Sequence, residues 1–259
     1  MPIKPLKKFG QNYLNDKNIV YKMIDCLNLQ SSDSVLEIGP GKGFITKEVS
    51  SKVEKFCAVE IDTRVIEELN SNFPKVKIIN SDFTKIKLSE LGLKFPLKII
   101  GNIPFNLTGD ILFKLLEEKK IVQEASFIIS HDIAKRLTAQ KRTKEYGALT
   151  VIFNYFSTIK LITKVSQNVF YPKPNIDAAI IHIIFDKTEL PQIESETFIK
   201  VVKASFGNRR KTLINSLRNS IFANCDFTSF EFNFSKRAEE LELIDFLYLT
   251  EFIQKNKCQ

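Results

Sequence analysis

Two kinds of hydrophobic pattern alternate along the chain as far as Phe185. Short apolar runs rich in β-branched and aromatic residues are separated by stretches in which apolar residues recur at helical spacing. The runs that read as strands are Ser34–Ile38, Lys55–Ile61, Val76–Asn80, Pro96–Ile100, Glu124–Ser130, Ser157–Val165 and Ala178–Phe185. The alternation predicts an α/β fold with a seven-stranded, mostly parallel sheet covered on both faces.

The pattern changes towards the C-terminus. The last two strands have no long helical stretch between them, which predicts an antiparallel hairpin at the sheet edge, linked through residues 170–174. Residues 186–196 are polar and include Pro191, and the sequence beyond them reads as helix. We therefore expect two domains, residues 1–190 around the sheet and residues 191–259 as a small helical domain.

The composition of the chain excludes several classes of protein. The chain is 44% hydrophobic and 26% charged, which is the range of soluble globular proteins. No stretch approaches the roughly 18 apolar residues of a membrane span, and no apolar run follows the basic start as in a leader. We expect a cytoplasmic protein. The four cysteines have no C-x-x-C spacing and the two histidines lie far apart, so we expect neither a disulfide framework nor a metal site.

The charge balance favours an anionic partner. A net charge of +8 and a pI near 9.2 suit a nucleic acid, although lysine also accumulates in proteins from AT-rich genomes. Cations cluster between residues 200 and 218, where acids are absent: Lys200, Lys203, Arg209, Arg210, Lys211 and Arg218. Gly207-Asn208 reads as a helix stop and a new N-cap. This predicts a helix from Arg209 to about Ile221 with Arg210 on its apolar face.

Three consecutive strands end in residues that suit a nucleoside cofactor. Residues 35–43 read VLEIGPGKG, a strand entering a glycine-rich turn that opens a helix, where the backbone can approach a ligand. The G-x-G-x-G spacing departs from the G-x-G-x-x-G of dinucleotide sites. Glu60 ends the next strand and can accept both ribose hydroxyls, while Asp82 and Phe83 follow the third. The alternative interpretations are a tight turn at the glycines and a simple cap at Asp82.

This ordered series resembles the class I S-adenosylmethionine-dependent methyltransferases. The resemblance implies a Rossmann-like sheet and S-adenosyl-L-methionine as cofactor. The fourth strand runs into Asn102-Ile103-Pro104-Phe105, which looks like the N/D-P/I/L-P-Y/F motif of enzymes that methylate exocyclic base amines. The Asn102 oxygen and the carbonyl before Pro104 can each accept one N6 hydrogen of adenine, and Phe105 can stack on the base. A proline-broken strand end is the alternative.

Further motifs narrow the resemblance to one family. Residues 8–16 (KFGQNYLND) are similar to K-R-F-G-Q-N/H-F-L, residues 171–179 (YPKPNIDAA) to x-P-x-P-x-V-D-S-A, and residues 206–213 (FGNRRKTL) to F-x-x-R-R-K-T-L. These motifs, in this order, resemble the KsgA family of ribosomal RNA adenine dimethyltransferases. Two positions depart from the family pattern: Phe105 stands where tyrosine is more frequent, and Ala178 where serine is usual.

The resemblance implies a reaction and a set of residues. Members transfer two methyl groups to N6 of each of two adjacent adenosines near the 3′ end of small-subunit rRNA, within an assembling small ribosomal subunit. The implied S-adenosylmethionine contacts are Asn12, Leu14, Gly39, Gly41, Glu60, Asp82 and Asn102. The implied catalytic residues are Asn102, Pro104 and Phe105, and the expected RNA contacts are Arg209, Lys211 and Arg218. We expect a monomer without a metal or a membrane partner.

Other functions remain open at this point. The methyltransferases that confer macrolide resistance share the sheet and the tetrad but modify one adenosine of large-subunit rRNA, and they lack a close match to Arg209-Arg210-Lys211-Thr212. An inactive methyltransferase-fold assembly factor is disfavoured by intact Gly39, Glu60, Asp82 and Asn102. An NAD-linked dehydrogenase is disfavoured by the glycine spacing. His131, after the fifth strand, reads as a hydrogen-bonded loop residue.

Overall fold

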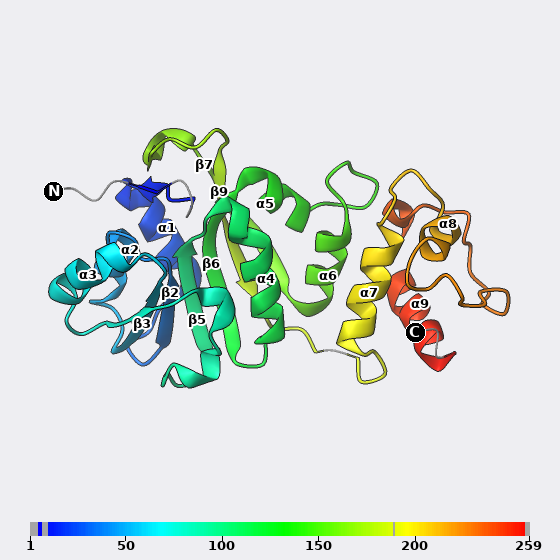
Figure 1. Ribbon diagram of the computed structural model, residues 1–259, viewed down its shortest axis with the longest axis horizontal. Helices are drawn as coiled ribbons and strands as arrows, with labels where there is room; N and C mark the ends of the chain where they lie inside the picture. Colours follow the sequence, from blue (N-terminus) through cyan, green and yellow to red (C-terminus); the bar gives the residue numbers. More distant parts are fainter. Residues whose placement is uncertain (1–4, 7–9, 189, 257–259) are drawn as a thin grey trace. The chain divides into compact units, whose positions relative to one another are not determined.

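The computed structural model describes residues 5–6, 10–188 and 190–256. Its main sheet has seven strands in the spatial order β4-β3-β2-β5-β6-β9-β7 (Figure 1). The strands are β2 (Ser34–Ile38), β3 (Lys55–Glu60), β4 (Lys77–Asn80), β5 (Leu97–Asn102), β6 (Val122–Ser130), β7 (Thr158–Val165) and β9 (Ala178–Ile184). All seven expected strands are therefore confirmed, with ends that shift by at most two residues.

The strand directions place the functional side chains at one edge. Strands β4, β3, β2, β5 and β6 pair in parallel, and β9 pairs antiparallel with β6. The neighbours β9 and β7 end the sheet, as the sequence predicts. Because β5 runs on to Asn102, the end of that strand lies level with Ile38 of β2 and Glu60 of β3 at the carboxyl edge.

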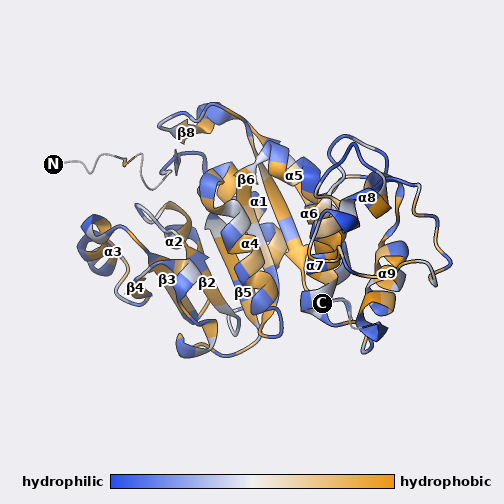
Figure 2. Ribbon diagram, turned by 45° about the vertical axis from the view of Figure 1, so that its right-hand side comes forward, coloured by the Kyte–Doolittle hydropathy of each residue, from blue (hydrophilic) through white to orange (hydrophobic). Residues whose placement is uncertain are grey.

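Helices cover both faces of the sheet because its strands are apolar on both sides. The helices of this part are α1 (Lys17–Leu27), α2 (Phe44–Val49), α3 (Ile66–Asn72), α4 (Thr108–Glu117) and the first residues of α5 (His131–Leu137). One core joins α1 and α2 to the sheet through Met23 of α1, Val49 of α2, and Val35 and Ile100 of the sheet. Helix α4 lies on the opposite face (Figure 1), and the central strands are mainly hydrophobic in colour (Figure 2).

A second, two-stranded sheet forms near the N-terminus. Strand β1 (Tyr13–Leu14) pairs antiparallel with β8 (Phe170–Tyr171), so that Tyr13 lies opposite Tyr171. These strands are not predicted from the sequence, because two residues are too few for a period to be visible. The pairing brings the N-terminal motif against the segment between β7 and β9. Lys8 and Phe9 of that motif lie outside the described residues.

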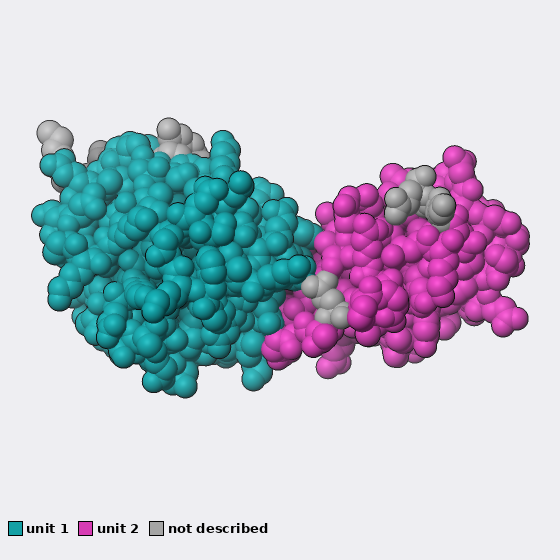
Figure 3. Space-filling model, turned by 90° about the horizontal axis from the view of Figure 1, so that it is seen from below, with its two compact units in different colours: residues 1–134, 159–185 teal, residues 135–158, 186–259 magenta. Residues whose placement is uncertain are grey.

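The chain divides into two compact units that differ from the expected domains. Unit 1 comprises residues 1–134 and 159–185, and unit 2 comprises residues 135–158 and 186–259 (Figure 3). Residues 135–158, which the sequence analysis places with the sheet, thus group with the C-terminal part. The reason is packing: α6 (Ala148–Phe156) contacts both α7 (Ser195–Ser205) and α9 (Leu243–Lys255).

The predicted helix from Arg209 to Ile221 is wrong at both ends. Helix α8 spans only Leu213–Arg218. The Asn208 side chain accepts a hydrogen bond from the Arg210 N–H at 3.2 Å, which holds a turn there instead. Arg210 is exposed and does not lie on an apolar helix face. Ile221 is 64% exposed, so the apolar face inferred from helical spacing does not extend that far.

The described cysteines differ in their covalent state. Cys26 and Cys57 are free thiols, whereas Cys225 is disulfide-bonded, which the spacing of the cysteines does not predict. Within the ranges given above, no helix combines the length and apolar character needed to cross a membrane. In the same residues no three His, Cys, Asp or Glu side chains gather as a metal site.

Candidate active site

A pocket of about 590 Å³ opens at the carboxyl edge of the sheet in unit 1. This volume suits a small-molecule ligand or cofactor. The pocket is lined by all nine residues that the sequence assigns to cofactor binding or catalysis: Asn12, Leu14, Gly39, Gly41, Glu60, Asp82, Asn102, Pro104 and Phe105. The fold therefore brings together residues spread over more than 90 positions of the chain, from five strand ends or turns.

The glycine turn gives the pocket its floor. Gly39 has φ +67°, and a Cβ added there would meet nothing within 4 Å, so the turn leaves space beside the pocket. Gly41 has φ +54°, and a Cβ there would come within 2.9 Å of the Tyr13 ring. Both positions need glycine for their backbone conformation, and Gly41 needs it for the close approach as well.

Glu60 ends β3 and is almost completely buried. Its carboxylate accepts the Gly41 N–H at 2.9 Å and the Asp62 N–H at 2.8 Å. Burial raises the pKa of this carboxyl, and the two N–H donors work against that shift. Each oxygen keeps acceptor capacity beyond the one bond it makes, so the group can still accept ligand hydroxyls.

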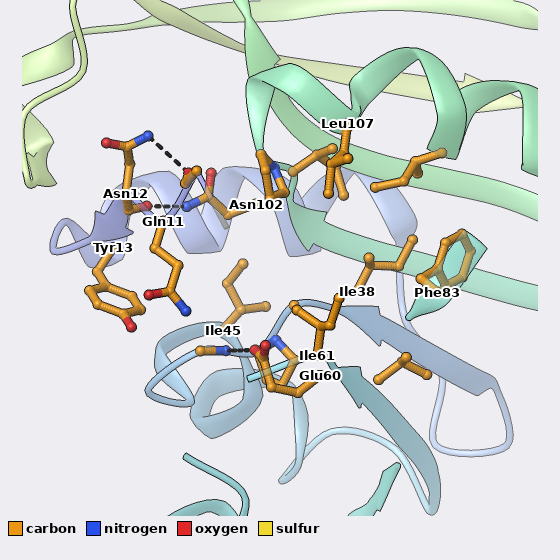
Figure 4. A pocket seen from close by; sticks show the side chains of 18 of the residues that line it. Gln11, Asn12, Tyr13, Ile38, Ile45, Glu60, Ile61, Phe83, Asn102 and Leu107 are labelled. Carbon is orange, nitrogen blue, oxygen red and sulfur yellow. Dashed lines mark hydrogen bonds between the residues drawn. The ribbon is translucent and has the colours of Figure 1, made fainter. Parts of the chain in front are cut away.

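Asn102 is held by the N-terminal segment. Its Nδ2 donates to the backbone carbonyl of Asn12 at 2.7 Å (Figure 4). The Ile103 N–H donates to the Ile128 carbonyl at 2.9 Å, which ties the tetrad to β6. Phe105 packs partly against the core and lines the pocket with its remaining surface. The amide oxygen of Asn102 and an aromatic ring thus share one end of the pocket.

The charged groups of the pocket favour a cation. Of the residues that line it, Glu60, Asp82 and Asp110 are acidic and Lys42 is basic. Asp82 also acts as a cap, since it accepts the Thr84 N–H at 3.0 Å, so both interpretations of Asp82 are compatible with its position. An excess of carboxylates beside a low-dielectric wall attracts positively charged ligands.

A hydrogen-bond network that local sequence patterns do not predict lies beside the pocket. Asp62 accepts hydrogen bonds from Gln11 Nε2 at 2.8 Å and from Arg64 Nε at 2.8 Å. The hydrogen bonds from Arg64 contribute most to holding the pKa of Asp62 down at about 2. Gln11 stands in the N-terminal motif, but its partner lies 51 positions away and no local pattern reveals the pairing.

Glu37, in the strand that leads to the glycine turn, is buried among apolar neighbours. One carboxyl oxygen accepts the Thr46 hydroxyl at 2.7 Å, and the other has no hydrogen-bond partner. Its neighbours across the strands are Ala58 and Ile100. Desolvation raises its pKa from the usual 4.5 to about 8. The side chain is therefore a neutral acid at pH 7.

A pH-dependent stability follows from Glu37. Between pH 4.5 and about 8 the folded chain holds a proton at this group that the unfolded chain has released, so its contribution to stability falls as pH rises through that window. We expect Glu37→Gln to remove this slope. Urea unfolding from pH 5 to 9 measures it: the wild-type stability minus that of the variant should decrease up to about pH 8 and then level off. Parallel pH profiles would show that Glu37 is ionised in the folded state.

The expected RNA contacts lie in unit 2. Lys211 and Arg218 are exposed. Arg209 pairs with Glu239 at 3.0 Å and also donates to the Lys144 and Thr143 carbonyls. These bonds engage Arg209 inside the unit. In unit 1, His131 begins α5 and donates its N–H to the Asp177 carbonyl at 3.0 Å, and it does not line the pocket.

Comparison with known proteins identifies the family of this chain. The family model "Ribosomal RNA adenine dimethylase" matches residues 4–255. The chain is 40% identical to "Ribosomal RNA small subunit methyltransferase A" of Chlorobium phaeobacteroides (strain BS1) over 94% of this chain and 91% of that protein. In fold it is similar to a dimethyladenosine transferase from Plasmodium falciparum (TM-score 0.79, 22% identity, 94% of this chain and 98% of that one).

The 23S rRNA methyltransferase ErmE has the same fold (TM-score 0.68, 24% identity, 94% of this chain and 100% of that one). Both structural likenesses concern the fold alone, whereas the family model and the bacterial relative also match in sequence over nearly the whole chain. The methyltransferase fold and the family resemblance inferred from the motifs are thereby confirmed. The chain belongs to the ribosomal RNA adenine dimethylase family.

Proposed function

We propose that the protein transfers methyl groups from S-adenosyl-L-methionine to N6 of two adjacent adenosines near the 3′ end of small-subunit rRNA. The observation that carries the proposal is the pocket itself, in which Glu60 and the Asn102 amide share one carboxyl sheet edge. The likeness to a bacterial small-subunit methyltransferase supports the choice of rRNA. The substrate is then RNA within an assembling small ribosomal subunit, and the protein acts as a cytoplasmic monomer.

The residues present fit this cofactor. The acidic lining suits the positive sulfonium of S-adenosylmethionine, and the open space at Gly39 leaves room for a ligand beside the turn. We assign cofactor binding to Asn12, Leu14, Gly39, Gly41, Glu60, Asp82 and Asn102. When bound, the cofactor supplies a methyl group already activated by the positive sulfur, so the protein needs no strong base early in the reaction. Its task is alignment.

We assign the target base to Asn102, Pro104 and Phe105. Because Asn102 Nδ2 donates to Asn12, its Oδ1 is left to accept a hydrogen from the adenine amine. The carbonyl before Pro104 can accept the second hydrogen, and the Phe105 ring can stack on the unstacked base. Two acceptors pull the amine towards tetrahedral geometry, which exposes its lone pair, and they stabilise the positive charge that develops on it.

The test uses the RNA itself. Primer extension on small-subunit rRNA from cells without the gene should lack two adjacent stops, and the stops should return when the purified protein and S-adenosylmethionine are added to small subunits from those cells. A single modified adenosine in large-subunit rRNA would favour the macrolide-resistance type instead. No modification of either RNA by folded protein would favour an assembly factor without activity.

Glu60→Ala should weaken S-adenosylmethionine binding by about 10- to 100-fold, because charge-assisted hydrogen bonds contribute roughly 1.5–3 kcal/mol. The variant also removes the acceptor of the Gly41 N–H, which loosens the turn that forms the pocket floor. Calorimetric titration measures the affinity, with Glu68→Ala on the exposed surface of α3 as the control. Unchanged affinity in a folded Glu60→Ala protein would refute the assignment of Glu60.

The cations of unit 2 should separate into two groups. We propose that Lys211 and Arg218 contact phosphates, and that Arg209 mainly supports the unit through Glu239. Lys211→Ala should weaken RNA binding and lower the salt slope by up to about one, with little change in melting temperature. Arg209→Ala should lower the melting temperature. Binding titrations over a salt series and thermal melts distinguish these two roles. If Arg209→Ala alone changes the salt slope, Arg209 contacts the RNA and Lys211 does not.

A further inference from the structure

We propose that Asp62 is a positioning residue for methyl transfer, acting through Gln11 and the Asn12 carbonyl on the amide of Asn102. This inference rests on the proposed function, in which Asn102 holds the target amine. Asp62 is only 2% exposed and does not line the pocket, so it has no direct route to a ligand there. Its influence must pass through neighbouring residues.

The first link joins Asp62 to the N-terminal segment. The carboxylate accepts Gln11 Nε2 at 2.8 Å, and Arg64 fixes the carboxylate by donating from both Nε and Nη2. At its other end the Gln11 amide oxygen accepts the Leu6 N–H at 2.8 Å. Gln11 therefore uses both polar ends of its side chain, which fixes its rotamer.

The second link joins this segment to Asn102. Asn12, the next residue, accepts Asn102 Nδ2 through its backbone carbonyl at 2.7 Å, and Figure 4 shows this bond with Gln11 pointing away from Asn102. On the other side of Asn12, Tyr13 and Leu14 pair with β8. The Asn12 carbonyl is thus held from both sides, by Asp62 through Gln11 and by the two-stranded sheet.

The position of this carbonyl matters because an asparagine amide has two nearly equivalent orientations. Donation from Nδ2 to Asn12 selects the orientation that leaves Oδ1 to accept the target amine. If the Asn12 carbonyl moves, the amide can turn and present its donor to the amine instead. A displacement of about 1 Å can slow a reaction by as much as about 100-fold even when the ligands still bind.

Two variants and a matched control test the proposal. Gln11→Ala and Asp62→Ala should each lower the single-turnover rate at saturating cofactor and RNA by about tenfold, while both dissociation constants stay within about twofold of wild type. Amide hydrogen exchange at residues 10–14 should become faster in both. The control is Asp16→Ala: Asp16, like Asp62, caps a helix through a backbone N–H two residues on, but its cap is at α1.

The double variant Gln11→Ala/Asp62→Ala should be no slower than the slower single variant, because both changes remove the same link. The inference is overturned if Gln11→Ala turns over at the wild-type rate, if the two losses multiply, or if a higher cofactor dissociation constant accounts for the whole defect. Asn102→Ala is measured in parallel. If that variant is as fast as wild type, the proposed function fails, whereas a slow Asn102→Ala with a fast Gln11→Ala refutes the positioning role alone.

Discussion

Replacing Asn102 by alanine should leave RNA binding nearly intact and slow methyl transfer by about 100-fold or more. The oxygen of this side chain accepts a hydrogen of the target amine, and that bond strengthens as positive charge develops on the nitrogen. The interaction is therefore stronger in the transition state than in the bound substrate, and its loss lowers turnover much more than affinity. The cations proposed for RNA binding lie in the other unit and remain unchanged.

Single-turnover methylation at saturating RNA and cofactor measures this effect, and filter binding measures the RNA dissociation constant separately. Asn18→Ala, on the exposed surface of α1, controls for the loss of an asparagine side chain. A wild-type rate in folded Asn102→Ala protein would mean that the tetrad does not hold the target base. A proportional loss of RNA affinity would mean that Asn102 acts in ground-state binding.

Lys98→Met should lower the free energy of unfolding by about 3–5 kcal/mol, because it leaves the buried Glu124 and the partly buried Asp33 without their cation. Lys98 Nζ lies 3.0 Å from Asp33, 3.2 Å from Glu124 and 2.8 Å from the Leu27 carbonyl. Glu124 also lies 2.6 Å from His182. The Lys98 ammonium thus joins the end of α1, the start of β2 and the start of β6, at the amino edge of the sheet.

Urea denaturation measures this loss, and the exposed pair Lys87–Glu90 provides the matched control. Both side chains of that pair are at least 70% exposed, so Lys87→Met should change stability by less than about 1 kcal/mol. The methylation rate per folded molecule should be unaffected, since Lys98 lies at the opposite end of the strand from Asn102. Equal stability losses in the two variants would show that the buried cluster is well solvated.

Local patterns in the sequence predict the sheet and several of the polar residues that line the pocket. Period and composition identify the strands. The chemistry at the strand ends indicates Gly39, Glu60 and Asp82, and the resemblance of residues 102–105 to a methyltransferase motif indicates Asn102. Parallel pairing then brings these ends together, because all of them follow strands that point the same way. For these residues, their position at the end of a strand in the sequence is enough to predict that they lie together at one edge of the sheet.

The features that local sequence patterns do not predict depend on tertiary contacts. Nothing near Gln11 indicates that it bonds Asp62, and nothing near Lys98 indicates the two carboxylates around it. The start of α8 depends on Leu213, whose N–H donates to the Lys236 carbonyl at 2.8 Å. Helical spacing between residues 209 and 221 is a weaker signal than such a contact, which explains the wrong prediction there.

The composition of unit 2 has a consequence for dissecting the protein. Its core is built from two separate stretches of sequence, and Phe153 and Phe156 of α6 are buried in the folded chain. A fragment that stops at residue 190 keeps these rings but loses α7 and α9, the helices against which α6 packs. During synthesis α6 emerges well before those partners. A chain truncated at residue 190 would therefore expose the apolar surface of α6 and be prone to aggregate. A loss of RNA binding in such a fragment would reflect this loss of solubility as well as the loss of the cations.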